Sequence, residues 1–62
     1  MQYIEEKFPA LADEINAINK WKGTVGILDA LEFIQANEEE YEGTACRREF
    51  RRFMREMAPL FA

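Results

Sequence analysis

The chain has 62 residues, with 12 acidic and 8 basic side chains, no His and one Cys. A single Cys forms no internal disulfide, and without His it cannot complete a Cys/His zinc site. The absence of His also excludes Ser-His-Asp and Cys-His catalysis. A single domain of this size buries only about 60% of its unfolded surface, so we expect efficient helix packing or a partner to stabilise it.

Enzymatic activity is not expected from the remaining motifs. The three glycines, Gly23, Gly26 and Gly43, match neither the dinucleotide-binding nor the P-loop pattern. So small a fold also has little room for a ligand pocket of about 300 Å³ or more. We therefore expect no cofactor and no metal. One Cys, no signal-peptide pattern and no apolar run long enough to cross a membrane predict a cytoplasmic location.

The first 22 residues contain a predicted helix over 9–22, preceded by a less regular segment. Pro9 suits a first helical turn, and Gly23 suits a C-terminal stop. The apolar residues at helical spacing are Leu11, Ile15 and Ile18. Residues 1–8 are interpreted as an N-terminal arm or a short helix, because Phe8 precedes a proline and is biased away from the α conformation.

A second helix is predicted over 24–37, with Thr24 as its N-cap. Its apolar set covers far more than the stripe of about 100° that a surface helix shows, which predicts a helix central to the fold or facing a second protein. Gly26 is expected to lower local helicity, with a close helix crossing as the alternative interpretation. An acidic hinge over 38–43 follows, with four glutamates that repel one another.

The third predicted helix covers 44–58, with Thr44 as its N-cap and Ala58-Pro59 as its end. Its apolar stripe consists of Cys46, Phe50, Phe53, Met54 and Met57. Residues 59–62 are predicted to form an apolar tail. Cys46 is interpreted as a small core residue, with a reactive thiol near the helix N-terminus as the alternative. Three short helices predict an all-α fold, a compact three-helix bundle that homodimerisation would complete.

The third helix carries all five arginines of the chain on one continuous arc. They are Arg47, Arg48, Arg51, Arg52 and Arg55. Residues 1–43 hold ten acidic and three basic side chains, a balance of −7, whereas residues 44–62 hold two acidic and five basic, a balance of +3. The net charge of −4 is therefore divided between two segments of opposite sign.

Three interpretations of the arginine face remain open. It is a solvated surface balanced by Glu38 to Glu42, a contact for carboxylates of a protein partner, or a contact for nucleic-acid phosphates. The net negative charge disfavours nucleic acid. It is also too small for a protein that mimics DNA, and no EF-hand loop is present.

The function that the sequence favours is protein binding without enzymatic activity, as an adaptor, regulator or inhibitor that forms a homodimer. The alternatives are a nucleic-acid-binding module and a structural piece of a larger assembly. Aromatic and arginine side chains are enriched at protein interfaces. The alternative interpretation of the aromatic residues is that they cap the ends of a small core. The predicted partner-binding residues are Trp21, Leu28, Phe33, Arg47, Arg48, Arg51, Arg52 and Arg55.

Overall fold

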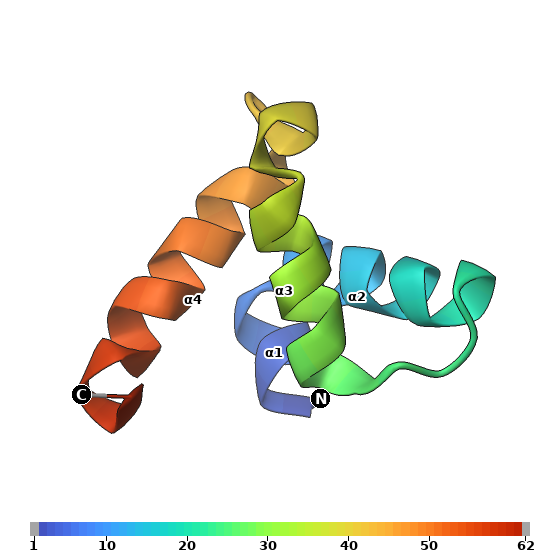
Figure 1. Ribbon diagram of the computed structural model, residues 1–62. Coiled ribbons are helices and arrows are strands. Elements are labelled where there is room, and N and C mark those ends of the chain that lie inside the picture. Colours follow the sequence, from blue (N-terminus) through green and yellow to red (C-terminus); the bar gives the residue numbers. More distant parts are fainter. Residues whose placement is uncertain (1, 62) are drawn as a thin grey trace.

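The computed structural model describes residues 2–61 and confirms the all-α prediction, because none of these residues lies in a strand. Three main helices follow a short N-terminal helix, and a 3₁₀ turn lies between the last two of them (Figure 1). The elements in chain order are α1 (Gln2–Lys7), α2 (Pro9–Trp21), α3 (Gly26–Ala36), η1 (Glu38–Tyr41) and α4 (Ala45–Phe61). Of the two interpretations of residues 1–8, the short helix is therefore correct for the described part.

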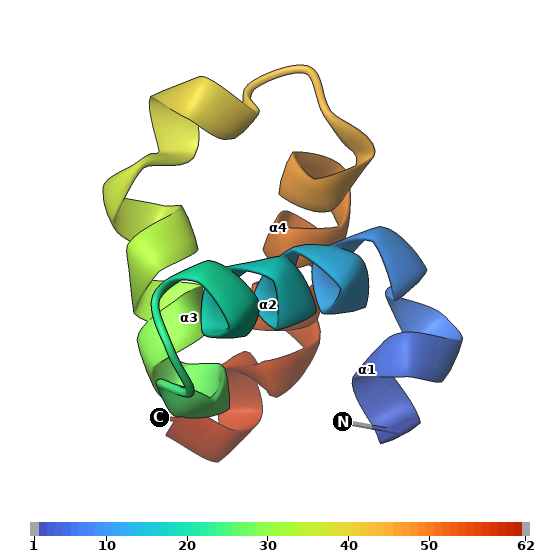
Figure 2. The same ribbon diagram turned by 90° about the vertical axis from the view of Figure 1, so that its right-hand side faces the viewer.

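The helix at the centre of the fold is α2. The helix predicted over 24–37, which is α3, is not central. Helix α2 packs against each of the other three helices (Figure 2), whereas within residues 2–61 α3 and α4 are not in close backbone contact. Figure 1 shows α3 and α4 diverging from the end where η1 joins them. The buried apolar residues are Ile4, Phe8, Leu11, Ala12, Ile15, Ile18, Ala30, Leu31, Ile34, Cys46, Phe50 and Phe53.

A proline breaks what would otherwise be one helix from α1 through α2. Phe8 adopts φ −135° and ψ 64°, as expected before a proline, while its N–H still donates to the Ile4 carbonyl at 2.7 Å. Because Pro9 has no N–H and the chain turns at Phe8, the first N–H groups of α2 lack partners within the helix.

Two side chains of α4 satisfy the backbone groups at this break. Glu49 Oε1 accepts hydrogen bonds from the N–H groups of Ala10 at 2.8 Å and Leu11 at 3.1 Å. Arg52 Nη2 donates to the carbonyl of Lys7 at 2.8 Å, on the other side of the break. The carboxylate lies at a helix N-terminus and the guanidinium at a helix C-terminus, so both charges also complement the helix dipoles. Glu49 and Arg52 therefore hold α4 against the junction of α1 and α2.

The start of α3 differs from the prediction. The helix begins at Gly26, its N-cap is Val25, and Thr24 makes no cap. The capping oxygen comes from α2, where Asn19 Oδ1 accepts from the N–H groups of Val25 at 2.9 Å and Gly26 at 3.0 Å. Gly26 has φ +86° and an empty space where a Cβ would be, so it serves the backbone turn and not a close helix crossing.

The predicted N-cap of α4 is confirmed, whereas its predicted C-terminal end is not. Thr44 caps its N-terminus as predicted, with Oγ1 accepting from the Arg47 N–H at 3.1 Å. The predicted end before Pro59 is wrong, because α4 continues to Phe61 with Pro59 inside it. The residues described as an apolar tail are thus helical as far as 61, and Ala62 lies outside the described residues. Pro59 removes one helical hydrogen bond, but the loss falls in an exposed last turn.

The acidic hinge is a 3₁₀ turn tied to the body of the protein. The Tyr41 hydroxyl donates to Glu14 Oε2 of α2 at 2.6 Å, and Gly43 supplies a positive φ of 83° before α4 begins. A hydroxyl that donates to a carboxylate holds its proton more tightly, and burial and this contact together raise the pKa of Tyr41 well above its usual value. The hinge therefore sets where α4 starts.

Substituting Glu49 tests whether the cap from α4 stabilises the fold. We expect Glu49→Ala to lower the free energy of unfolding by about 2 kcal/mol, because two N–H groups lose a charged acceptor. For a domain of this size that corresponds to a Tm lower by roughly 10 °C. Glu49→Gln keeps an acceptor and should cost about half as much. Thermal and urea unfolding followed by circular dichroism measure both.

The matched control for Glu49 is Glu42→Ala, an exposed glutamate in the turn before α4. It should change the free energy of unfolding by no more than about 0.5 kcal/mol. Equal effects of Glu42→Ala and Glu49→Ala would show that the helix cap contributes nothing specific.

Candidate functional site

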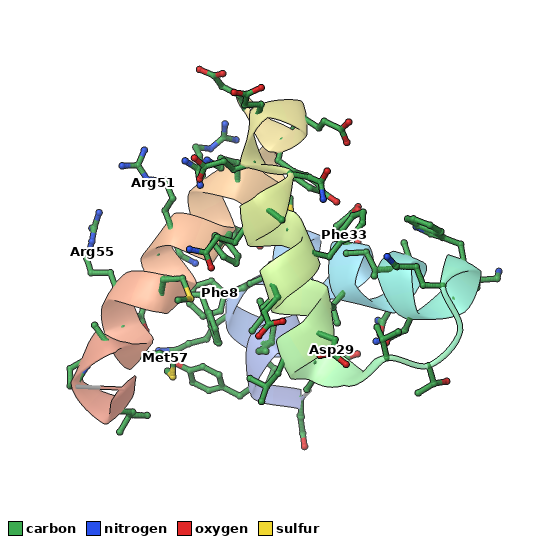
Figure 3. All side chains as sticks on the ribbon, viewed as in Figure 1. Phe8, Asp29, Phe33, Arg51, Arg55 and Met57 are labelled. Carbon is green, nitrogen blue, oxygen red and sulfur yellow. The ribbon has the colours of Figure 1, made fainter. Side chains whose placement is uncertain are left out.

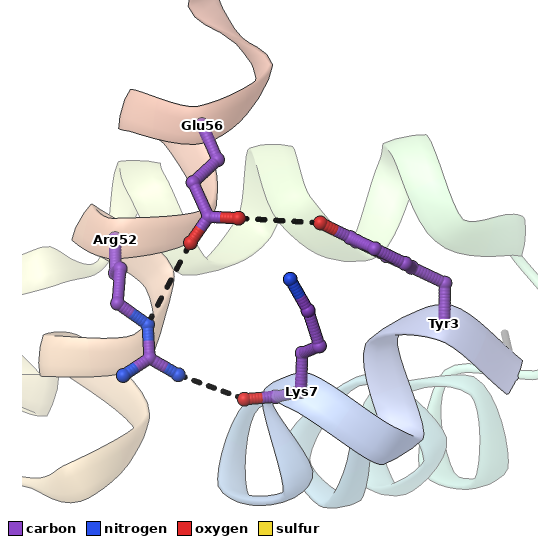
Figure 4. A network of polar contacts seen from close by, with 4 residues as sticks. All are labelled: Tyr3, Lys7, Arg52 and Glu56. Atoms are coloured by element: carbon purple, nitrogen blue, oxygen red, sulfur yellow. Dashed lines mark hydrogen bonds and ion pairs between the residues drawn. The ribbon is translucent and has the colours of Figure 1, made fainter.

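Two of the five arginines of α4 are engaged with other residues of the protein. Arg52 donates to Lys7, lies over the Phe8 ring at 4.7 Å from its centroid, and has its Nε 3.9 Å from Glu56 Oε2 (Figure 4). Arg47 Nη2 lies 3.2 Å from Glu38 Oε2 of η1. The interpretation of the arginine face as a surface balanced by the hinge glutamates is therefore correct for Arg47.

The other three arginines have no such partner among the residues that the structure describes. No carboxylate oxygen of residues 2–61 forms an ion pair with Arg48, Arg51 or Arg55. Arg51 and Arg55 project side by side from α4, away from the other helices (Figure 3). Their spacing of four residues places them on one face of the helix, one turn apart. They are charged groups available to an external ligand.

An apolar groove lies beside Arg51 and Arg55, between α3 and α4. Its volume is about 160 Å³, and it is lined by Leu28, Leu31, Glu32, Gln35, Phe50 and Met54. Leu31 and Phe50 belong to the buried core, whereas Leu28 is 70% exposed. The surface continues past Phe50 and Met54 into a polar depression that Arg51 and Arg55 also line. The groove exists because α3 and α4 diverge and no backbone fills the space between them.

Trp21 and Phe33 form a separate cluster on the α2 side of α3. Their ring centroids are 5.6 Å apart in an edge-to-face arrangement, and Phe33 points from α3 toward α2 (Figure 3). Lys22 Nζ lies 4.5 Å from the Phe33 centroid and 5.4 Å from that of Trp21. Trp21 remains 64% exposed. The predicted surface is thus divided, with Leu28, Arg51 and Arg55 on one side and Trp21 and Phe33 on the other.

Several residues of the groove were not predicted as site residues. Leu31 belongs to the apolar set of the helix predicted over 24–37, and Phe50 and Met54 to the apolar stripe of the helix predicted over 44–58. Glu32 and Gln35 are polar residues of the first of these helices and were assigned no role. Helical spacing indicates which of these residues share a face. It does not indicate that the faces of α3 and α4 meet at an open angle, because that angle depends on α2 and η1.

Cys46 is a buried thiol, as its place on the apolar stripe predicted. Its side chain belongs to the core, and burial raises its pKa to about 11, with Glu14 and Glu49 adding to the effect. A thiolate is the reactive form of cysteine, so the burial and the raised pKa of Cys46 support the core interpretation over the reactive one. Within the described part of the chain, no group of three His, Cys, Asp or Glu side chains is placed to hold a metal ion.

No family model, no curated protein and no solved structure matches this chain. Among residues 2–61, no helix has the length and apolar character needed to span a membrane. The features that bear on function are therefore the groove, the three arginines without an ion pair in residues 2–61, and the aromatic cluster.

The Cys46 thiol should make the stability of the protein fall at alkaline pH. Its pKa is higher in the folded protein than the value of 9.0 for an exposed thiol, so the folded state keeps the proton longer. The contribution to stability is complete below about pH 9 and is lost as the pH rises toward 11. Because Tyr41 also titrates late, the measurement is the difference in unfolding free energy between wild type and Cys46→Ala across pH 8 to 10, in urea.

Cys46→Ala is expected to lose less stability than wild type over that interval. In the native protein at pH 7.5, Cys46 should react with a thiol reagent at least about tenfold more slowly than in urea. Reaction at the same rate in both conditions would contradict the burial of Cys46.

Proposed function

We propose that this protein is a small, non-enzymatic, intracellular protein-binding module that docks a helix of a partner in the groove between α3 and α4. One observation carries the proposal: an apolar groove with an exposed Leu28 lies beside Arg51 and Arg55, which have no ion-pair partner in residues 2–61. Apolar contacts supply affinity in such grooves, and charges at the rim select the partner. A single cysteine that remains a free thiol suits a reducing compartment.

The chemistry of the groove defines the partner. A helix fits such a groove with apolar residues at i, i+3, i+4 and i+7 facing inward. Arg51 and Arg55 are one helical turn apart, so carboxylates spaced by one turn on the partner would meet both. Arginine binds carboxylates with two parallel hydrogen bonds, which favours an acidic partner over a neutral one. The expected partner segment is therefore an amphipathic helix with an acidic edge.

A designed peptide tests the proposal. The probe is a fluorescein-labelled amphipathic helix of about 18 residues, with leucines at helical spacing and glutamates along one edge. We expect saturable binding by fluorescence anisotropy, and a Kd at least about tenfold higher for Leu28→Asp and for Arg55→Ala. Binding should weaken as salt rises, because the arginine contacts are exposed.

Two variants are matched controls for the peptide experiment. Leu60→Asp changes another exposed leucine outside the groove, and Arg48→Ala removes an arginine that does not line it. Both should bind the peptide within about twofold of wild type. If Leu28→Asp and Leu60→Asp weaken binding equally, the groove is not the docking site.

A second candidate function, nucleic-acid binding, is favoured by one observation. Arg48, Arg51, Arg52 and Arg55 line a single open depression of about 540 Å³ along α4. Guanidinium groups in this arrangement suit phosphates. The net charge of −4 opposes such binding, and Arg52 is already engaged with Lys7 and Glu56. This function is therefore second to protein binding.

Arg48 distinguishes the two functions. If the depression binds nucleic acid, a labelled oligonucleotide of about 20 nucleotides should bind at about 50 mM salt, and each phosphate contact should steepen the salt dependence. Arg48→Ala should then weaken oligonucleotide binding while Leu28→Asp leaves it unchanged. The peptide should show the opposite pattern. Failure of the oligonucleotide to bind in RNA, single-stranded DNA and duplex forms excludes this second function.

A further inference from the structure

The two walls of the groove between α3 and α4 carry opposite charges. On the α3 wall, Glu32 lies one turn from the exposed Leu28. On the α4 wall, Arg51 and Arg55 flank Met54 along the rim. None of these three charged side chains forms an ion pair within residues 2–61. The groove is therefore acidic and apolar along one edge and basic along the other.

A surface of this kind is complementary to itself. We infer that the partner helix in the groove is α3 of a second copy of this chain, related by a two-fold axis; this inference rests on the proposed function of the groove. The axis places α3 of each copy in the groove of the other. Leu28 of one copy then packs over Leu31, Phe50 and Met54 of the other. The carboxylate of Glu32 meets Arg51 and Arg55 of the second copy.

Charge and apolar exposure both support this arrangement. Two copies related by two-fold symmetry form the contact between Glu32 and the arginine pair twice, so one pattern of residues serves both sides. Leu28, a large apolar residue of α3 that is 70% exposed, becomes buried without any change in its helix. The occupant needs no segment beyond those described, since α3 already carries the leucine and the carboxylate at one-turn spacing.

The size of the protein sets the expected affinity. A standard interface buries about 800 Å² of the accessible surface of each partner, whereas the accessible surface of the whole chain is 4417 Å². An interface built on one groove and one helix of 11 residues is therefore at or below the standard size. We expect a dimer with a Kd in the micromolar range, which sedimentation equilibrium measures at protein concentrations from about 1 μM to 1 mM.

A pair of charge-reversed variants tests the arrangement. The first is Glu32→Lys, and the second combines Arg51→Glu with Arg55→Glu. In a dimer of either variant with itself, like charges face each other across both halves of the interface, and the Kd should rise at least about tenfold. In a mixture of the two, every introduced charge faces its opposite. The mixed dimer should therefore form with a Kd within about threefold of wild type.

A matched control uses charges outside the groove. Asp29→Lys reverses another acidic residue of α3, and it should dimerise as wild type does, because Asp29 does not line the groove. All these positions are exposed, and circular dichroism confirms that each variant keeps the helical content of wild type. A loss of dimer in the single variants without recovery in the mixture would overturn the proposed contact.

The outcomes also separate this inference from the proposed function. If wild type remains monomeric at about 1 mM while the acidic peptide binds in a manner that depends on Leu28, the groove docks a different partner and the second copy is excluded. If wild type dimerises and the charge-reversed mixture recovers, the second copy is established. If wild type is monomeric and the peptide does not bind, both the inference and the proposed function are wrong.

Discussion

The fold depends on how α4 satisfies the break that Pro9 makes between α1 and α2. A proline at this point removes one N–H and turns the chain at Phe8, which leaves backbone groups on both sides of the break without partners inside their helices. Glu49 supplies the acceptor for α2, and Arg52 supplies the donor for α1. These two side chains are three positions apart on α4 and therefore share a face, so one helix caps both sides of the break. The position of α4 follows from this contact.

That contact divides the arginines into two groups with different roles. Arg52 donates a hydrogen bond to the last turn of α1 and lies over the Phe8 ring. Arg47 forms an ion pair with Glu38 of the acidic turn η1. Both are therefore part of the folded structure. Arg51 and Arg55 lie on the same helix but on the side that α1, α2 and η1 leave open. An arginine-rich helix need not be a uniform binding surface, because the burial of its neighbours decides which guanidinium groups remain available.

The sequence predicted the helices well and their junctions less well. Apolar spacing located α2, and Thr44 and Gly23 marked ends that the structure retains. The predicted start of α3 was wrong because the oxygen that accepts from its first N–H groups belongs to Asn19, in another helix. No local pattern indicates an acceptor contributed from six residues earlier. Glu49 was missed for the same reason, at a separation of 39 residues from Ala10. The groove was also missed, because it arises from an angle between helices that depends on α2 and η1.

The central place of α2 explains why part of the apolar surface of α3 remains exposed. A helix packed on one side only buries one stripe, and α3 uses that stripe, Ala30, Leu31 and Ile34, against the core. Its remaining apolar residues exceed what α2 can cover, so Leu28 stays exposed. Burying such a leucine in an interface contributes about 2 kcal/mol, a large share of the stability available to a chain of this size. Any partner that covers Leu28 therefore stabilises the fold as well, because ligands that bind only the native state shift the folding equilibrium toward it.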